Sequence, residues 1–398
     1  MTQYLIIGNG VAGTTAAENI RLKDKEGKIT IVTDEDLPFY SRIRLNEYIA
    51  GDITEDELVI RKDQWYRERN INLLLETRVV EADPGNKTVS SEDGKEFPYD
   101  KLLLATGSHS FIPPIKGAEM GGVFALRNIA DARKIIAAAD GGESIVIIGG
   151  GLLGLETGNG FVKRGKSVAV VEFFPRLLPR QLDTPGAKKL QNIMEGMGFS
   201  FRLGAKTQEI TGGDRVEGVA LEGGEQLKAD LVVISAGVRP NMKLAELMGL
   251  ECDKGIIADN YLSAGGDIYV AGDAAQFGPM PYGIWPAASE QGKIAGLNMA
   301  GEKTEYNGTP MANTLKIVGI DLASAGEIDE ENEHESIVVD EGITYKKLVI
   351  EDNKIIGAIM LGKKEGFNKI TSAMKEKKDI SKYKKEILSP GFDFKKLD

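Results

Sequence analysis

A short apolar run that stops at glycine opens the chain, and the pattern around it predicts a strand, a tight turn and a helix. Residues 4–7 (YLII) are apolar and lead into the glycine-rich residues 8–13 (GNGVAG). A helical pattern follows over residues 14–22, and a second apolar run covers residues 28–33. Apolar runs of this length bounded by glycine favour buried strands, so the segment predicts a strand, turn, helix and strand in succession.

The same order returns in the middle of the chain. Residues 144–148 (SIVII) precede the second glycine-rich stretch, residues 149–154 (GGGLLG). A helical pattern then runs to Arg164, and residues 167–171 form the next apolar run. One such glycine pattern is a weak signal, but two in the same context are hard to produce by chance. The sequence therefore predicts two units of the same construction.

The glycines of each unit have the spacing of the Rossmann dinucleotide fingerprint. Gly8 permits the tight turn, Gly10 lets the backbone approach a pyrophosphate, and Gly13 allows close packing of helix on strand. N–H groups at the start of the helix would bind the anion without a cationic side chain. The residues expected to contact a dinucleotide at the two turns are Gly8, Gly10, Val11, Ala12, Gly13, Gly149, Gly151, Leu152, Leu153 and Gly154.

Acidic residues end the second strand of each unit. Asp34 and Glu35 follow the first, with Glu35 favoured, and Glu172 follows the second. A carboxylate here accepts hydrogen bonds from ribose hydroxyls and would repel the 2′-phosphate of NADP, so Glu172 predicts NADH as the nucleotide. Arg176 and Arg180 lie nearby and weaken this preference, since either could reach a phosphate.

Three further apolar runs also stop at glycine. They end in residues 102–107 (LLLATG), 232–237 (VVISAG) and 267–273 (DIYVAGD). A glycine at the carboxyl end of a parallel strand lets the backbone pass close to a ligand. We therefore expect Ala236 and Gly237, at the end of the second of these runs, to border a nucleotide.

The composition of the chain mainly excludes classes of protein. The chain has 398 residues, enough for two or three domains, and its 42% hydrophobic and 27% charged residues are typical of a folded globular protein. A net charge of −11 disfavours nucleic acid as a partner. No run approaches the roughly 18 apolar residues that a membrane span needs. With no basic leader before the first strand, we expect a cytoplasmic protein without membrane attachment.

Few side chains could bind a metal or carry a thiol. Cys252 is the only cysteine, and His109 and His334 are the only histidines. A single cysteine excludes an internal disulfide and a cysteine-ligated iron–sulfur or zinc site, so we expect no metal site. We expect Cys252 to be structural, His109 to lie in a loop and His334 to lie in an exposed acidic segment.

The charge is uneven along the chain. Residues 361–398 hold eleven lysines and six acidic residues, a net charge of +5. The simplest interpretation is a solvated, lysine-rich helix over residues 368–378. The alternative is a docking patch for an acidic electron carrier.

The order of these motifs resembles the pyridine nucleotide-disulfide oxidoreductase superfamily over about residues 1–310. The resemblance implies an α/β fold with two Rossmann-like domains, the second inserted in the first. Residues 1–109 and 238–311 would bind FAD, and residues 110–237 would bind NADH. Residues 312–398 would form a small α+β domain. Its strands are expected near residues 336–339, 345–351 and 355–361.

The resemblance also implies roles for residues outside the first glycine turn. Val79 would meet the adenine of FAD through its backbone. Ala105, Thr106 and Gly107 would line the isoalloxazine ring, and Gly272 with Asp273 would bind the ribityl chain.

Two further side chains are candidates near the flavin. Arg42 could hold the FAD phosphates or the flavin edge. Trp285 begins a predicted helix with Pro286 in its first turn, and it could either cover the ring or pack in the core.

Within the superfamily, residues 38–47 (PFYSRIRLNE) are informative because disulfide reductases place their redox-active cysteines there. This stretch has no cysteine, so electrons would leave directly from the flavin. Together with residues from 313 onward, it is similar to NADH:rubredoxin reductases and to the flavin-binding part of nitrite reductase large subunits. Related ferredoxin reductases often carry lysine at the place of Glu47, paired with a glutamate that Glu156 matches. Glu156 is therefore a candidate residue near the nicotinamide.

These resemblances imply an FAD-dependent NADH oxidoreductase that passes electrons to a small carrier such as rubredoxin. The cofactors would carry the hydride chemistry, so no catalytic triad is expected. Two alternatives stay open: an NADH oxidase that reduces oxygen, and a flavoprotein subunit of a larger redox complex. The C-terminal domain often forms a dimer interface in the superfamily, but it is short here, and a homo-oligomer is left open.

Overall fold

The computed structural model describes residues 1–309, 312–317 and 319–397, with the backbone alone described for residues 312–317. The chain forms two compact units, each described below by itself. Unit 1 comprises Met1–Arg44, Ile53–Ser110 and Val238–Pro310, and unit 2 comprises Leu45–Asp52, Phe111–Gly237 and Met311–Asp398. The predicted domain boundaries stay predictions, and the one at residue 311 lies outside the described residues.

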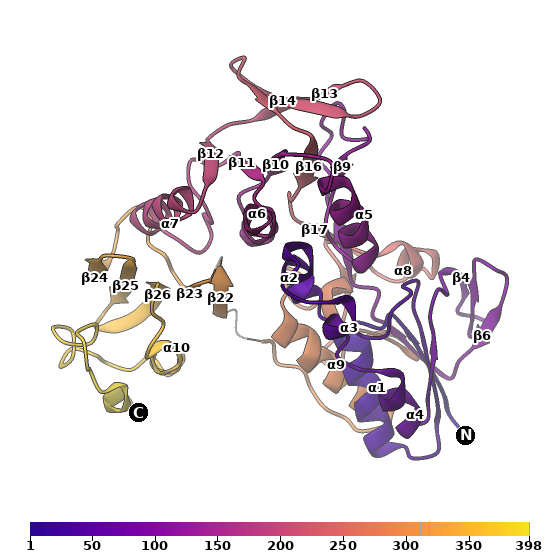
Figure 1. The fold of residues 1–398 in the computed structure, drawn as a ribbon. Coiled ribbons are helices and arrows are strands. Elements are labelled where there is room, and N and C mark those ends of the chain that lie inside the picture. Colours follow the sequence, from indigo (N-terminus) through magenta and orange to yellow (C-terminus); the bar gives the residue numbers. More distant parts are fainter. Residues whose placement is uncertain (310–311, 318, 398) are drawn as a thin grey trace. The chain divides into compact units, whose positions relative to one another are not determined.

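A six-stranded sheet forms the centre of unit 1 (Figure 1). Its strands are β1 (Gln3–Ile7), β2 (Lys28–Val32), β3 (Ile71–Leu74), β7 (Lys101–Leu104), β19 (Ser263–Gly265) and β20 (Ile268–Val270). They lie in the order β19-β20-β7-β1-β2-β3, and the pairings from β20 to β3 are parallel. The carboxyl ends of these strands therefore meet at one edge, where a nucleotide can bind.

The side chains of β1 alternate between two cores, one on each face of this sheet. Leu5 and Ile7 lie in one core, and Tyr4 and Ile6 lie in the other. This follows from the period of two residues along a strand. The core that holds Ile6 also contains the buried residues of helices α1 (Val11–Lys23) and α9 (Trp285–Met299).

Helices α1 and α9 cross at very short range because glycine and alanine meet at their contact. A Cβ on Gly292 would lie 2.3 Å from the carbonyl oxygen of Ala12, and one on Gly296 would lie 2.5 Å from that of Ala16. Any larger residue would push the helices apart. The contact fixes the start of α1, which follows the first glycine turn.

Smaller elements complete unit 1. Antiparallel strands β4 (Val79–Asp83), β5 (Thr88–Ser91) and β6 (Glu96–Pro98) form a separate sheet. Two short pairings join β8 (Ser108–Ser110) to β17 (Val238–Pro240) and β18 (Ile256–Ile257) to β21 (Ala275–Gln276). The remaining helices are η1 (Arg42–Arg44), α3 (Glu55–Leu58), α4 (Asp63–Glu68), α8 (Lys243–Leu247) and η2 (Gly272–Ala274).

Unit 2 contains a second parallel sheet. Its strands are β9 (Val123–Phe124), β10 (Ser144–Ile148), β11 (Ser167–Glu172), β12 (Phe199–Leu203) and β16 (Leu231–Ile234), in the order β12-β11-β10-β16-β9. An antiparallel sheet accompanies it, formed by β13 (Thr207–Gly212), β14 (Val216–Leu221) and β15 (Gln226–Lys228). The helices are α2 (Leu45–Ala50), α5 (Ile129–Ala139), α6 (Leu152–Lys163) and α7 (Thr184–Gly196).

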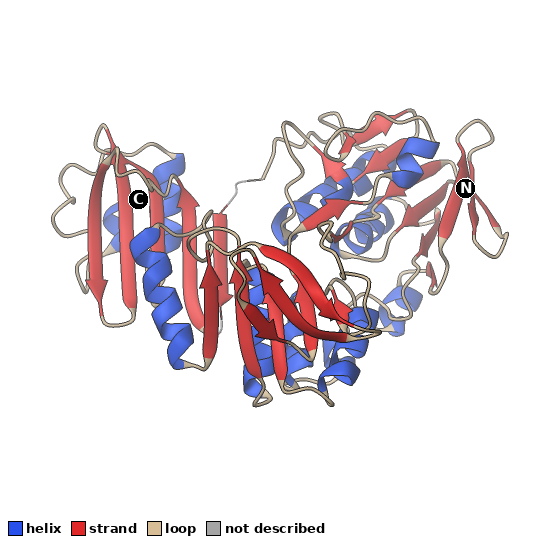
Figure 2. Cartoon of the chain, turned by 90° about the horizontal axis from the view of Figure 1, so that it is seen from above, coloured by secondary structure: helices blue, strands red, loops and turns tan. Residues whose placement is uncertain are grey.

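The end of the chain forms an antiparallel sheet, which we call the C-terminal sheet (Figure 2). Its strands are β22 (Ala312–Ile317), β23 (Ile320–Gly326), β24 (Glu335–Glu341), β25 (Thr344–Glu351) and β26 (Lys354–Leu361), in the order β22-β23-β26-β25-β24. Helix α10 (Phe367–Lys375) packs on this sheet, with Ile370 in the same core as Leu348 and Met360. A short helix, η3 (Phe394–Leu397), follows.

The predicted α/β fold is confirmed. The three strands expected near residues 336–361 are present as β24, β25 and β26. The lysine-rich helix is shorter than the predicted residues 368–378, because α10 ends at Lys375. None of the helices in the described part of the chain is long and apolar enough to cross a membrane.

Candidate nucleotide-binding sites

The first glycine turn, residues 8–13, connects β1 to α1 in unit 1. Gly8 has φ +112°, and a Cβ there would lie 2.1 Å from the carbonyl oxygen of Ala105. A Cβ on Gly13 would lie 2.0 Å from the carbonyl oxygen of Gly8. Gly8 must be glycine because its backbone is left-handed and the chain after β7 approaches it closely. Gly13 must be glycine because α1 packs directly against Gly8.

Gly10 differs from the other two glycines of this turn. It is the N-cap of α1, makes no side-chain capping bond, and a Cβ there would meet no atom of the described residues within 4 Å. Nothing in the protein explains a glycine at this position. The space beside Gly10 and the uncapped N–H groups of α1 fit a pyrophosphate, which a Cβ would obstruct.

Asn9, between these glycines, carries a polar group without a partner. Its side chain is buried, and its Oδ1 accepts a hydrogen bond of 2.9 Å from the Tyr66 hydroxyl. Its Nδ2 has no hydrogen-bond partner in the part of the chain that the structure describes. A buried N–H donor left unpaired is costly, so Nδ2 fits a ligand oxygen at the turn. Sequence reasoning passed over Asn9, although a polar residue inside a glycine turn could have drawn attention to it.

The acid that follows β2 is held by two side chains. Glu35 is half-buried, and its carboxylate accepts hydrogen bonds from the Tyr40 hydroxyl and from the Arg42 guanidinium. Arg42 also donates to the Tyr40 oxygen at 3.1 Å. Asp34 is exposed, which agrees with the preference for Glu35. Arg42 thus fixes a carboxylate, and its expected contact with FAD stays a prediction.

Residues from four separated segments meet at the carboxyl end of β7. Asp273 accepts a hydrogen bond of 2.8 Å from the Ser108 hydroxyl, and the N–H of Gly272 donates to Gln291 of α9 at 2.9 Å. Thr106 donates through its hydroxyl to the carbonyl of Asn241 at 2.9 Å, and the Asn241 amide donates back at 2.8 Å. These bonds order the residues that the resemblance assigned to the flavin ring and ribityl chain.

Three other predicted residues have defined places in unit 1. Trp285 is the first residue of α9, and its ring centroid lies 5.8 Å from that of Phe39. Val79 begins β4, and Gly107 has φ +67° just before β8. Their contacts with a flavin stay predictions.

The second glycine turn, residues 149–154, repeats the geometry of the first in unit 2. Gly149 has φ +115°, and a Cβ there would lie 2.2 Å from the carbonyl oxygen of Ser235. A Cβ on Gly154 would lie 2.1 Å from the carbonyl oxygen of Gly149. Gly151 is the N-cap of α6 and makes no side-chain capping bond, and among the residues that the structure describes no atom lies within 4 Å of a Cβ there. This turn also fits a pyrophosphate.

The acid of the second turn is held by backbone groups. Glu172 is 7% exposed and accepts hydrogen bonds from the N–H of Gly150 at 2.6 Å and the N–H of Phe174 at 2.8 Å. These donors stabilise the carboxylate beside the glycine turn. The expected contact of Glu172 with a ribose stays a prediction.

Two aromatic side chains follow Glu172 and were not anticipated. Phe173 is 64% exposed and Phe174 is 52% exposed, with their rings edge to face at 5.6 Å. Large exposed apolar side chains beside a nucleotide turn are candidates for contact with an adenine ring. Their place directly after the acid was the available sequence signal.

The remaining residues predicted for the second site lie on one helix and one loop. Leu152, Leu153 and Glu156 lie on the first turns of α6, and Glu156 is half-buried. Ala236 and Gly237 follow β16, and the Gly237 carbonyl accepts from the N–H of Phe111 at 2.9 Å.

Helix α2, which carries Glu47, packs on α6 within unit 2. The Thr157 hydroxyl of α6 donates to Asn46 of α2 at 2.9 Å. A Cβ on Gly160 would lie 3.2 Å from Ile49 of α2. The helix that carries Glu156 is thus braced by the segment that carries Glu47.

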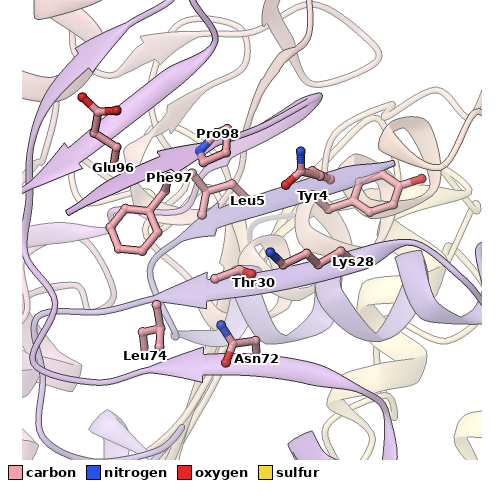
Figure 3. A pocket seen from close by; sticks show the side chains of 10 residues that line it. Tyr4, Leu5, Lys28, Thr30, Asn72, Leu74, Glu96, Phe97 and Pro98 are labelled. Carbon is pink, nitrogen blue, oxygen red and sulfur yellow. The ribbon is translucent and has the colours of Figure 1, made fainter. Parts of the chain in front are cut away.

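A pocket in unit 1 lies apart from the first glycine turn (Figure 3). It occupies the face of the six-stranded sheet that carries Leu5 and Thr30, beside β6. Residues 8–13 are not among its lining residues, which are Gln3, Tyr4, Leu5, Lys28, Thr30, Asn72, Leu74, Glu96, Phe97 and Pro98. This pocket therefore does not include the first glycine turn.

The single cysteine and the two histidines were not predicted to contact a nucleotide. Cys252 is partly buried in the core of the unit 1 sheet that holds Leu5, and burial raises the pKa of its thiol. His109 lies in β8 and bonds to Asn241 at 2.7 Å, so it is a strand residue and not the predicted loop residue. His334 lies 3.9 Å from Glu351. Among the described residues there is no group of three His, Cys, Asp or Glu that could hold a metal.

Comparison with known proteins assigns most of the chain to a family. Residues 2–292 match the pyridine nucleotide-disulphide oxidoreductase family, and residues 310–378 match the C-terminal domain of rubredoxin NAD+ reductases. The chain is 38% identical to nitrite reductase [NAD(P)H] of Bacillus subtilis, over 98% of this chain and 49% of that protein. It is 35% identical to an NADH oxidase of Methanocaldococcus jannaschii, over 81% of this chain and 75% of that protein.

A solved structure extends the likeness to the whole fold. The chain is similar to the NADH:rubredoxin oxidoreductase of Clostridium acetobutylicum, with a TM-score of 0.82, 29% identity and coverage of 96% of each chain. It spans about half the length of the first curated relatives, 49% and 51%. Since one family match covers residues 2–292, the chain belongs to the pyridine nucleotide-disulphide oxidoreductase family, whose members use FAD and NADH.

Proposed function

We propose that this chain is an NADH oxidoreductase that binds FAD at the first glycine turn and NADH at the second, and passes electrons to a small carrier such as rubredoxin. The observation that carries the proposal is the matched geometry of the two turns. Each has an uncapped helix N-terminus, a glycine facing open space and an acid at the end of the next strand.

On the FAD side, the residues of unit 1 would bind and orient a resident cofactor. The N–H groups at the start of α1 and the unpaired Nδ2 of Asn9 would bind the pyrophosphate. Glu35 would accept from the ribose, and Asp273 would accept from the ribityl chain. Gly8 and Gly13 keep β1, β7 and α1 close enough to form the site.

On the NADH side, α6 and Glu172 would bind a nucleotide that exchanges in each turnover. The N–H groups at the start of α6 face the place of a pyrophosphate, and the Glu172 carboxylate would accept from the ribose hydroxyls. The bound cofactors would supply the redox chemistry, which is hydride transfer from nicotinamide to flavin and release of single electrons. The protein would orient the two cofactors for transfer and keep other molecules from contacting them.

The electron acceptor is inferred from what the sequence lacks and from its charge. Residues 38–47 hold no cysteine, so no thiol relay can form there. Several lysines after residue 361 are exposed and could attract an acidic carrier. They are Lys363, Lys375, Lys377, Lys382, Lys385 and Lys395. The match of residues 310–378 to the C-terminal domain of rubredoxin NAD+ reductases supports rubredoxin as that carrier.

The acceptor is tested by anaerobic stopped-flow spectroscopy. The FAD-loaded protein is first reduced with NADH and then mixed with oxidised rubredoxin. The proposal predicts fast reoxidation of the flavin together with loss of the rubredoxin visible bands, at a rate that falls as salt screens the lysines. A reduced flavin that persists in the presence of rubredoxin would reject this acceptor.

Two other functions have specific support. The similarity to an NADH oxidase favours direct reduction of oxygen, which predicts fast reoxidation of the flavin by dissolved oxygen without any carrier. The coverage of 49% of a nitrite reductase favours a role as the flavoprotein part of a larger complex. That role predicts co-purification with a partner that contains the missing redox centre.

A further inference from the structure

Arg176, four residues after Glu172, is held by the C-terminal sheet region. Its Nη1 lies 3.2 Å from the Glu330 carboxylate, which belongs to the turn between β23 and β24. Its Nε and Nη2 donate to the carbonyls of Leu182 and Pro179, each at 3.2 Å. The guanidinium is therefore bound by one anion and by two carbonyls of its own loop.

The loop that carries Arg176 lies against the second glycine turn. A Cβ on Gly150 would lie 3.0 Å from the Leu177 side chain and 3.1 Å from a carboxylate oxygen of Glu172. Leu177 is fully buried, and the N–H of Phe174 binds Glu172. Arg176 thus sits in a segment that borders the expected ribose position, where a guanidinium could bind a 2′-phosphate.

Glu330 also fixes the end of this loop. It accepts from the Thr184 hydroxyl at 2.6 Å and from the Thr184 N–H at 3.0 Å, at the start of α7. Next to it, Asp183 caps α7 and accepts a bond of 2.6 Å from the Tyr345 hydroxyl. Buried Lys347 lies 3.3 Å from the same Asp183 oxygen. The C-terminal sheet region therefore sets where the loop runs.

We propose that Glu330 is a positioning residue for nucleotide preference: by binding Arg176, it withholds the guanidinium from the 2′ position and so favours NADH over NADPH. The inference rests on the proposed function, because it assumes that NADH binds at α6. Arg–phosphate pairs are strong and bidentate, so an arginine released beside the ribose would stabilise a 2′-phosphate that Glu172 alone would repel. Nucleotide preference would then depend on a residue outside the nucleotide fold.

The test removes the charge of Glu330 and then asks whether removal of Arg176 reverses the effect. Glu330→Gln keeps the size of the side chain and a carbonyl that can accept from Thr184, but it removes the ion pair with Arg176. Glu331→Gln is the matched control, since Glu331 is the exposed neighbour on the same turn. Arg176→Ala and the Glu330→Gln/Arg176→Ala double variant complete the cycle. Each FAD-loaded protein is reduced anaerobically with NADPH and with NADH.

The inference predicts that Glu330→Gln raises the NADPH:NADH ratio of flavin-reduction efficiencies about tenfold, which corresponds to one charge-assisted contact. The control should leave this ratio unchanged, and the double variant should return it to the wild-type value. A ratio that does not move in Glu330→Gln, or a gain that survives in the double variant, would overturn the inference.

Failure of the proposed function has a different signature. If neither nucleotide reduces the wild-type flavin, the oxidoreductase proposal fails, and calorimetric titration with 2′,5′-ADP and 5′-AMP then tests the same contact without turnover. Glu330→Gln should tighten 2′,5′-ADP binding about tenfold and leave 5′-AMP within twofold, roughly the range of an unchanged site. Unchanged 2′,5′-ADP binding would overturn the inference by this route as well.

Discussion

The two glycine turns have the same backbone geometry but hold their acids differently. Gly8 and Gly149 have φ of +112° and +115°. A Cβ on Gly8 would lie 2.1 Å from the carbonyl oxygen of Ala105, and one on Gly149 would lie 2.2 Å from that of Ser235. In unit 1, Glu35 is held by the side chains of Tyr40 and Arg42. In unit 2, Glu172 is held by two backbone N–H groups.

This difference suits a resident ligand in one unit and an exchanging ligand in the other. Unit 1 adds a buried amide donor, Asn9, whose unpaired Nδ2 would gain a bond whenever a ligand is present. Unit 2 has Gly150 at the equivalent position, so its turn offers backbone groups alone. A site that offers more ligand-dependent bonds releases its ligand more slowly, because most affinity differences lie in the dissociation rate.

The largest expected effect breaks the first turn. Gly8→Ala would place a Cβ 2.1 Å from a carbonyl oxygen at a left-handed φ, so we expect no folded protein with bound FAD. Gly10→Ala is the matched variant, because its Cβ meets no protein atom. It should keep the thermal stability of the FAD-free protein and lose FAD, measured by absorbance at 450 nm. FAD retained by Gly10→Ala would argue against a pyrophosphate at this turn.

The second expected effect removes the anchor of the loop after Glu172. Lys347→Met leaves the buried carboxylates of Asp183 and Asp329 without their cation, and it should lower the free energy of unfolding by about 3–5 kcal/mol. Urea denaturation at neutral pH measures the loss. Lys346→Met, on the neighbouring half-buried residue of the same strand, should change it by less than about 1 kcal/mol. Equal losses in both variants would show that the ion cluster is not the anchor.

The third prediction separates the two acids. Glu172→Ala should raise the KM for NADH about tenfold, through loss of charge-assisted bonds to the ribose, and should raise the KM for NADPH much less. FAD content should stay normal. Glu35→Ala should show the opposite pattern, with weaker FAD binding in dialysis and little change in the NADH dependence of the protein that still holds FAD. Equal effects of Glu172→Ala on both nucleotides would remove its assignment to the ribose.

The smallest expected effect concerns the unpaired amide. Asn9→Ala should weaken FAD binding about five- to tenfold, the size of one typical hydrogen bond. Tyr66→Phe is the control, since it removes the hydroxyl that binds Asn9 but leaves the amide in place. It should change the Kd for FAD less than Asn9→Ala does. The reverse order would mean that Asn9 serves the protein core and not the cofactor.

Local patterns in the sequence predicted the parts of the fold that depend on neighbouring residues. The runs ending at Gly8 and Gly149 gave β1, β10 and the helices that follow, because strand, turn and helix are encoded within about thirty residues. The antiparallel strands β13 to β15 were not predicted, because the polar residues of β13 (TQEITG) and β15 (QLK) form no apolar run. His109 was misassigned to a loop because its pairing with Arg239 comes from a distant segment.

Site positions were predicted from the sequence where the backbone geometry accepts a single residue type. Gly8, Gly13, Gly149 and Gly154 fall under this rule, because a Cβ at any of them would strike the backbone. Contacts that depend on tertiary structure were not accessible. The Asn9 side chain is held by a hydrogen bond from Tyr66, which leaves its Nδ2 unpaired. Arg176 forms an ion pair with Glu330, which lies more than a hundred residues later in the chain.

The most direct test of the central claim is an anaerobic NADH titration of the FAD-loaded protein, wild type beside Gly151→Ala, followed at 450 nm. We expect the wild-type flavin to bleach with about one NADH per flavin, since each NADH carries two electrons. Gly151→Ala should fold, keep its yellow FAD and stay oxidised, because its Cβ meets no atom of the described residues and obstructs only the second turn. Loss of FAD from Gly151→Ala, or full bleaching of its flavin by NADH, would contradict the assignment of FAD to the first turn and NADH to the second.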